Sequence, residues 1–324
     1  MTSTLITCAN TAARPGSPSA GDTVYQEDTK QIITYDGSAW RVYDSDGTGG
    51  YALDGSNTLT AVPLFHFDAA KINGTDASGN PSNAAALTGA WTSKINGVAT
   101  FAQGTGSKQP TWYSSGTSSE SYLSSDGGDE LQVEFRNAFT GPISGAFTAM
   151  AVMERDTGAT NFGMGGSSGG TQTEDPTSWD TGAPWWHHTS GAKDYLYYGQ
   201  TGTDNTVAPT FASGSGNGST AVATYDVTRL LMVVRDSSNN TRLYVDGNNT
   251  NTSNVATFSG LFQFDWMWRV YGSGYLSDGH TYEMALWDSD LSAADKNIII
   301  SYANSRYGTG RNADDSDNLA RATF

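Results

Sequence analysis

Short β-like segments, separated by turn-forming residues, run through most of this 324-residue sequence. Each is a run of apolar and aromatic residues, and clusters of Gly, Ser, Asn or Asp lie between the runs. Strands at this density without intervening helices predict an all-β protein, either an antiparallel sandwich or a barrel. The clearest segments are residues 63–67, 147–153, 230–234, 241–245, 262–271 and 281–287.

One helix and two polar segments complete the predicted organisation. Ser292 begins a Ser-x-x-Asp pattern that favours a helix start, and apolar residues recur at helical spacing from there to Gly308. Residues 44–57 are rich in Gly, Ser and Asp, which is typical of a linker. We therefore expect an N-terminal module with its linker at residues 1–57, a sandwich at 58–308 and a polar tail at 309–324.

The beginning of the chain contains a small β unit of its own. Runs at residues 23–26, 31–35 and 39–43 alternate with turn-type sequences, which predicts a three-stranded meander. So small a unit buries too little apolar surface to be stable alone, so we expect it to contact other subunits in a homo-oligomer. The residues predicted to form this contact are Val24, Tyr25, Ile32, Ile33, Trp40 and Val42.

The chain is strongly acidic, with 17 Lys and Arg against 33 Asp and Glu. Because the resulting net charge of −16 repels phosphate groups, we expect no nucleic-acid partner. No apolar run approaches the roughly 20 residues of a membrane-spanning helix, so we expect no membrane insertion. The first residues lack a secretory signal, which predicts folding in a cytoplasm.

No motif in the sequence predicts catalysis. Retaining glycosidases need two carboxylates about 5 Å apart, yet we find no Glu-x-Asp-x-(x)-Glu pattern. The nearest segment, residues 129–134, alternates as an ordinary amphipathic strand does. Residues 165–169 match Gly-x-Ser-x-Gly, but the surrounding Gly/Ser-rich sequence indicates a loop. We therefore expect a protein that is not an enzyme.

The most unusual cluster of side chains combines aromatic residues with two adjacent histidines. Adjacent histidines in an extended segment point to opposite faces, so they are poorly placed to bind one zinc ion. The rings either pack in the sandwich or a subunit contact, or they form a platform for sugar rings. The cluster comprises Trp185, Trp186, His187, His188, Tyr195, Tyr197 and Tyr198.

Two segments resemble the concanavalin A-like, or laminin G-like, jelly rolls. Residues 228–247 look like the hairpin of that family that ends in Tyr-Val-Asp-Gly, and residues 279–295 resemble its closing strand and the helix start after it. The resemblance implies a jelly roll and possible calcium ligands at its rim, but Asp-Gly pairs also simply form turns. No cofactor or metal is therefore assigned. The available carboxylates are Asp246, Asp265, Asp278 and Asp288.

The N-terminal module resembles a short module of bacteriophage virion proteins, notably tail and fibre-like components. Residues 13–25 contain Arg-Pro-x-x-Pro, and residues 34–40 contain Tyr-Asp-Gly-Ser-Ala-Trp. The resemblance implies a virion protein, assembled in the host cytoplasm, that contacts other virion proteins in tail or capsid, with a trimer as first choice. The lectin-like jelly roll would serve particle architecture or adhesion to host-surface glycans. The alternative is a polysaccharide depolymerase or glycosidase of the virion.

Overall fold

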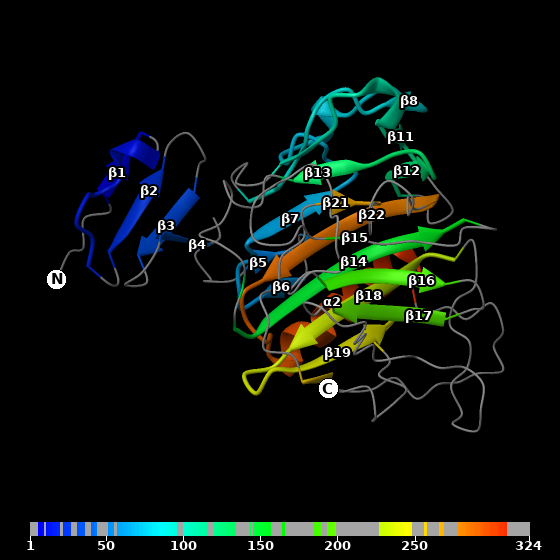
Figure 1. Cartoon of the computed structure of the whole chain (residues 1–324). Coiled ribbons are helices and arrows are strands. Elements are labelled where there is room, and N and C mark those ends of the chain that lie inside the picture. Colours follow the sequence, from blue (N-terminus) through cyan, green and yellow to red (C-terminus); the bar gives the residue numbers. More distant parts are fainter. Residues whose placement is uncertain are drawn as a thin grey trace, which may run out of the picture.

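In the computed structural model, the chain forms a β-sandwich with a helix on one side and a separate small sheet at the N-terminus (Figure 1). The predicted all-β antiparallel sandwich with a C-terminal helix is confirmed. The structure describes residues 6–9, 11–19, 22–26, 31–35, 40–43, 51–54, 57–95, 100–115, 120–133, 143, 145–156, 164–165, 184–189, 193–198, 227–247, 256–257, 266–268 and 278–309.

The large sheet of the sandwich has the strand order β20-β19-β18-β14-β22-β12-β11-β8. Its longest strand, β22, pairs with β14 along one side, while β12 and β7 share the other side. All of these pairings are antiparallel. The strands are β7 Phe65–Asp68, β8 Ala85–Ala86, β11 Thr111–Tyr113, β12 Tyr122–Asp126, β14 Phe147–Arg155, β18 Arg229–Arg235, β19 Asn240–Val245, β20 Ala256–Thr257 and β22 Asp278–Trp287.

The smaller sheet covers one face of the large one and has the order β15-β21-β13-β10-β9. Fully buried aromatic rings, among them Phe67, Trp91 and Phe101, fill the space between the sheets. The hairpin of β16 and β17 contacts β15. These elements are β9 Trp91–Thr92, β10 Thr100–Ala102, β13 Leu131–Val133, β15 Met164–Gly165, β16 Pro184–Thr189, β17 Lys193–Tyr198 and β21 Trp266–Met267, with short 3-10 helices η2 Ala77–Gly79 and η3 Gly106–Lys108.

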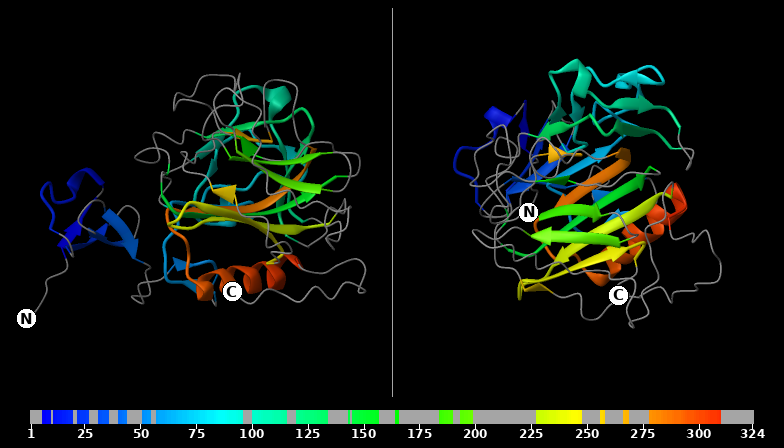
Figure 2. Two further views of the ribbon diagram at one scale, coloured as in Figure 1. Left: turned by 60° about the horizontal axis from the view of Figure 1, so that its bottom comes forward. Right: turned by 45° about the vertical axis from the view of Figure 1, so that its right-hand side comes forward.

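Helix α2 (Ala293–Tyr307) lies against the opposite face of the large sheet, as the left view of Figure 2 shows. The side chain of Ser292 accepts a hydrogen bond from the backbone N–H of Asp295, and Gly308 ends the helix with a φ of 68°. Both ends therefore lie where the sequence predicts them. Among the described residues, no helix is long and apolar enough to cross a membrane.

A register shift between β14 and β22 changes which side chains face α2. The shift occurs between Val152 and Met153, so that one residue of β22 is skipped in the pairing. As in a β-bulge, two successive side chains of the strand can then face the same side. Tyr282 belongs to the core on the helix side, and Glu283 bonds to Tyr302 of α2.

The N-terminal sheet consists of β1 to β4, and β1 pairs with β2 in parallel. The predicted meander is present as β2 to β4. Val24 and Ile33 do not lie at its surface, because they are buried with Cys8 in a small core of the sheet itself. Tyr25 is half-buried, and the side chains of Ile32, Trp40 and Val42 lie outside the described ones, so the homo-oligomer stays a prediction. The elements are β1 Ile6–Cys8, η1 Thr11–Ala13, β2 Thr23–Gln26, β3 Gln31–Tyr35 and β4 Trp40–Tyr43.

The predicted linker, residues 44–57, overlaps the sandwich. Strand β5 (Tyr51–Ala52) pairs with β6 (Thr58–Leu59), and Leu53 is buried in the same core as α2. The boundary of the sandwich therefore lies before Tyr51 rather than at residue 58. Of the predicted tail, 309–324, only Thr309 is described, and it is buried.

Candidate functional site

Between α2 and the large sheet, hydrogen-bonding side chains surround one buried carboxylate. Glu283 of β22 is fully buried, and its Oε2 accepts hydrogen bonds from Tyr302 at 2.7 Å and Tyr307 at 2.5 Å. Its Oε1 forms a short contact with Nε2 of His66, from β7. The Nδ1 atom of His66 lies 2.5 Å from the hydroxyl of Tyr51.

Arg306, in the last turn of α2, adds a second set of ion pairs. Two of its nitrogens lie 3.1 Å from the two carboxylate oxygens of Asp68, and Nη1 lies 3.4 Å from Glu283. Burial alone would raise the pKa of Glu283, but His66 and Arg306 outweigh it and hold the pKa at about 2. This buried set, which we interpret as structural and call the helix lock, is His66, Asp68, Glu283, Tyr302, Arg306 and Tyr307.

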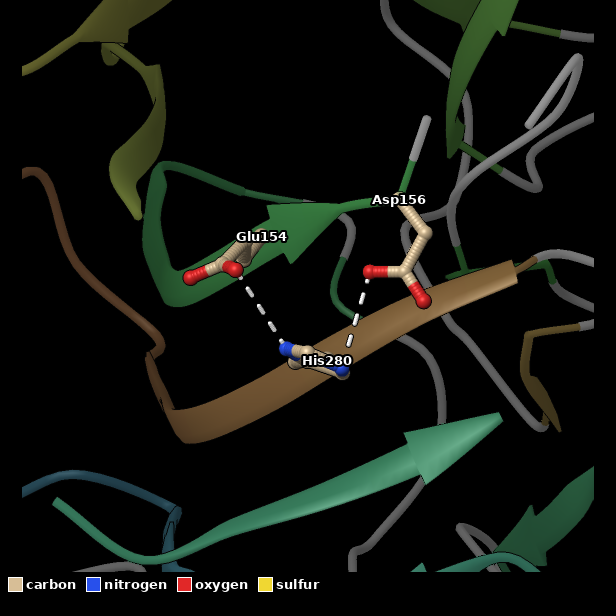
Figure 3. A group of neighbouring side chains, drawn as sticks. All are labelled: Glu154, Asp156 and His280. Carbon is tan, nitrogen blue, oxygen red and sulfur yellow. Dashed lines mark ion pairs between the residues drawn. The ribbon is translucent and has the colours of Figure 1, made fainter. Parts of the chain in front are cut away.

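A second group of titratable side chains lies nearer the surface, where β14 ends and β22 begins (Figure 3). Nδ1 of His280 is 3.5 Å from Oε1 of Glu154, and Nε2 is 3.5 Å from Oδ1 of Asp156. The imidazole ring therefore lies between two carboxylates. The exposed fraction of the side chain rises from 3% for Glu154 to 17% for His280 and 33% for Asp156. We call these three residues the His280 site.

Glu154 is the inner carboxylate of the His280 site. Its Oε2 accepts hydrogen bonds from the hydroxyls of Thr228, at 2.7 Å, and Tyr282, at 3.0 Å. Burial alone would raise the pKa of Glu154, but the nearby imidazole of His280 and the hydrogen bond from Thr228 outweigh it and the pKa is lowered. Glu154 is therefore held in its ionised form.

Asp156 is the outer carboxylate, and its pKa is shifted in the opposite direction. Burial and the nearby negative charge of Asp278 raise the pKa of Asp156, and His280 counteracts them only in part. Environments that move two neighbouring pKa values apart are typical of an acid and base pair. Glu154 and Asp156 are separated by one residue, and this Glu-x-Asp spacing after an apolar strand is a signal that the sequence interpretation overlooked.

Aromatic rings lie beside the His280 site on the same part of the sheet. The rings of Tyr113 and Tyr122 stack at a centroid distance of 4.9 Å with an angle of 11° between their planes. The ring of Tyr122 lies 4.2 Å from that of His280. Tyr113 and Tyr122 are both half-buried. We call Tyr113, Tyr122 and His280 the ring row.

Several aspartates continue from the His280 site along the neighbouring strand ends. Asp278 pairs in register with Asp126, and the side chain of Asp129 accepts a hydrogen bond of 3.2 Å from the backbone of Asp126. Burial and the charges of Asp126 and Asp278 raise the pKa of Asp129 to about 6. We call Asp126, Asp129, Asp156 and Asp278 the acidic rim.

The His280 site is the group of possible metal ligands found among the described residues, with ligand atoms within 4.8 Å of one another. The donors are poorly arranged for one ion, because different ring nitrogens of His280 face Glu154 and Asp156. A histidine ordinarily binds a metal ion through one nitrogen while the other donates to a second group. The geometry therefore fits an imidazole between two carboxylates better than a three-ligand metal centre.

The predicted aromatic cluster lies on the β16 and β17 hairpin. Trp185 pairs in register with Tyr197, and His187 pairs with Tyr195. The side chains of this cluster are outside the described ones, so the glycan platform and the packing alternative both stay predictions. The residues so placed on the hairpin are Trp185, Trp186, His187, His188, Tyr195, Tyr197 and Tyr198.

Of the possible calcium ligands, only Asp278 lies at the acidic rim. Asp246 instead accepts hydrogen bonds from Arg229, at 2.6 Å, and from the backbone of Leu230. Its own φ of 50° and the following Gly247 are typical of a turn. Asp288 is exposed beyond the other end of β22, and Asp265 lies outside the described residues, as do residues 166–169 of the predicted loop.

The chain matches no protein-family model and no curated protein. Among solved structures, it is similar to the Trypanosoma rangeli sialidase in complex with sialic acid, at 12% identity and a TM-score of 0.34, over 73% of this chain and 32% of that one. It is also similar to the ligand-binding domain of botulinum neurotoxin serotype D in complex with N-acetylneuraminic acid, at 9% identity and a TM-score of 0.41, over 74% and 50%. The chain spans about a quarter to a half of the length of the structures it matches.

These comparisons correct one prediction. The expectation that the chain is not an enzyme rested on a missing carboxylate motif, and it is contradicted because several of the similar structures are sialidases. A glycosidase therefore belongs among the functions to be tested. At these identities and TM-scores the likeness assigns neither an activity nor a ligand to the chain.

Proposed function

We propose that this protein is a virion component that binds a host-surface glycan at the ring row and the His280 site. The observation that carries the proposal is the ring row itself, in which two stacked tyrosines lie directly beside His280 and its carboxylates. Sugar rings have apolar C–H faces that stack on aromatic rings and hydroxyl groups that donate to carboxylates. The cluster offers both kinds of contact within one small surface.

The virion part of the proposal depends on the N-terminal module. Its sequence resembles phage tail and fibre-like components, and Cys8, Val24 and Ile33 form a core among the described side chains of its sheet. A sheet of so few residues is expected to gain stability from contacts with other chains. We therefore propose attachment to other virion proteins, and a homo-oligomer with a trimer as first choice, through residues 1–50.

Hydrolysis of the bound glycan is the second candidate function, and the carboxylate pair favours it. Asp156, with its raised pKa, would protonate the glycosidic oxygen as the bond to the anomeric carbon breaks, and a water molecule would then bond to that carbon and return a proton to Asp156. Glu154, held ionised, would stabilise the positive charge that develops on the sugar. Hydrolysis ranks second because Glu154 is 3% exposed and the ring of His280 lies between the two groups.

A ring-removal variant tests glycan binding. We expect Tyr113→Ala to weaken retention of the protein on host-surface polysaccharide about tenfold, which corresponds to roughly 1 kcal/mol of lost stacking. Tyr113→Phe, which keeps the ring, is the matched control and should bind as the wild type does. Affinity electrophoresis in gels containing the polysaccharide measures both. Equal binding by all three proteins would place any glycan site elsewhere, with the β16 and β17 hairpin tested next by Trp185→Ala.

The same polysaccharide distinguishes binding from cleavage. If the wild type forms new reducing ends in the polysaccharide and neither Glu154→Gln nor Asp156→Asn does, the result would support hydrolysis at the His280 site. Release that persists in both variants would show that this pair is not the catalytic one.

A truncation tests attachment to the particle. Because β5 belongs to the sandwich, the deletion should end at residue 50 rather than at the predicted boundary of 57. We expect the shortened chain to remain folded and to be absent from purified particles, as measured by quantitative immunoblotting. Incorporation at normal copy number would show that the sandwich carries the attachment surface.

A further inference from the structure

We infer that the glycan recognised at this site carries free amino groups, so that its preferred ligand is a cationic amino sugar. The inference rests on the proposed function and adds the chemical class of the ligand. Its basis is the combination of the ring row with the acidic rim, which meet where β22 begins, because Asp278 lies two residues before His280 and the ring of His280 lies beside Tyr122.

The carboxylates of the acidic rim lie close together. Asp126 and Asp278 are partners in the β12 and β22 pairing, and the negative charge of Asp278 acts on Asp156. Asp129 joins them through the backbone of Asp126. A surface with this charge repels sialic acid and other acidic sugars and attracts cations.

Among the described side chains, the ion pair of the acidic rim is the one between His280 and Asp156. The basic residues that form ion pairs contact other carboxylates. Arg306 contacts Asp68 within the helix lock, and Arg229 contacts Asp246. Likewise, Lys108 pairs with Glu130 and Lys296 with Asp290. Among the side chains that the structure describes, the basic groups with ion pairs therefore lie away from the rim.

Mutual repulsion within the rim adds to the effect of burial on two of its carboxyl groups. Negative neighbours contribute to the raised pKa of both Asp129 and Asp156. A protonated amine between these groups would favour their ionised forms and gain charge-assisted hydrogen bonds. Tyr113, which stacks on Tyr122 at the outer end of the ring row, would offer its other face to cations as well as to sugar C–H groups.

Binding of matched oligosaccharides tests the inference. By isothermal titration calorimetry at pH 6, we expect a glucosamine hexamer to bind at least tenfold more tightly than the N-acetylglucosamine hexamer, and oligosialic acid not to bind. The preference should fall when salt is raised, because the amine and the carboxylates are partly exposed. Asp156→Asn and Asp278→Asn should each reduce the preference several-fold.

Asp288→Asn provides the matched control, because it makes the same change of charge beyond the other end of β22. It should leave the preference unchanged. If it reduces the preference as much as Asp156→Asn does, the effect comes from net charge and the inference is wrong. Equal binding of the two hexamers also overturns the inference but keeps the proposed glycan function. Failure of every glycan tested, including the host polysaccharide, overturns both.

Discussion

Replacing Glu283 by glutamine should lower the free energy of unfolding by about 3 kcal/mol or more, as is typical when one partner of a buried ion pair is removed. Glutamine keeps the size of the side chain but removes the charge that His66 and Arg306 face. Its amide N–H groups would also point toward the hydroxyl donors of Tyr302 and Tyr307. Urea denaturation followed by tryptophan fluorescence measures the loss.

Glu120→Gln is the matched control, because Glu120 also pairs with Arg306 but its side chain is 29% exposed. Exposed ion pairs contribute less than about 1 kcal/mol, so this variant should unfold close to the wild type. A similar loss for both variants would show that the helix lock contributes no more than a surface ion pair. A loss confined to Glu283→Gln would identify the buried carboxylate as the group that fastens α2 to the sheet.

Local signals in the sequence predict the helix correctly. Ser292 supplies the N-terminal cap and Gly308 adopts the left-handed conformation that ends the helix, and both act through neighbouring residues alone. The major strands are predicted correctly for the same reason, because the apolar runs that form them and the turn-forming residues between them are local signals. The helix lock cannot be predicted in this way, because it joins His66, Glu283 and Arg306 from three distant elements.

The His280 site shows what sequence reasoning misses and why. Its residues meet only because β12 and β14 flank β22, which is a pairing of distant strands that periodicity does not reveal. The register shift between Val152 and Met153 also changes the face of the sheet on which the side chains of residues 279–281 lie. The Glu154-x-Asp156 spacing was visible in the sequence, but nothing local distinguishes it from ordinary strand alternation.

The predicted linker is instructive in another way. Gly, Ser and Asp dominate residues 44–57, and composition therefore favours a flexible connection. Tyr51 and Leu53 nevertheless belong to the sandwich, because their packing partners are supplied by α2 and β7, far along the chain. A few apolar residues are enough to order a polar segment when a distant surface is ready to cover them.

Replacing Asp129 by asparagine should stabilise the protein by about 3 kcal/mol at pH 8 and by almost nothing at pH 3.5. The ordinary pKa of 3.8 applies to the unfolded chain, while the pKa of Asp129 in the folded protein is about 6. Below both values the group is neutral in both states and has no effect. As the pH rises from about 4 to 6, only the unfolded state gains by ionising, so the wild type loses stability that Asp129→Asn retains.

Thermal unfolding of the two proteins across this pH range measures the difference. Asparagine keeps an oxygen that can accept the backbone hydrogen bond of Asp126, so the comparison isolates the charge. An equal difference at pH 3.5 and pH 8 would contradict the prediction, because it would then come from packing. Burial is the main cause of the raised pKa of Asp129, and the charges of Asp126 and Asp278 add to it, so a cation bound at the acidic rim would relieve the second part. The stabilising effect of Asp129→Asn should therefore shrink when a glucosamine oligomer is present.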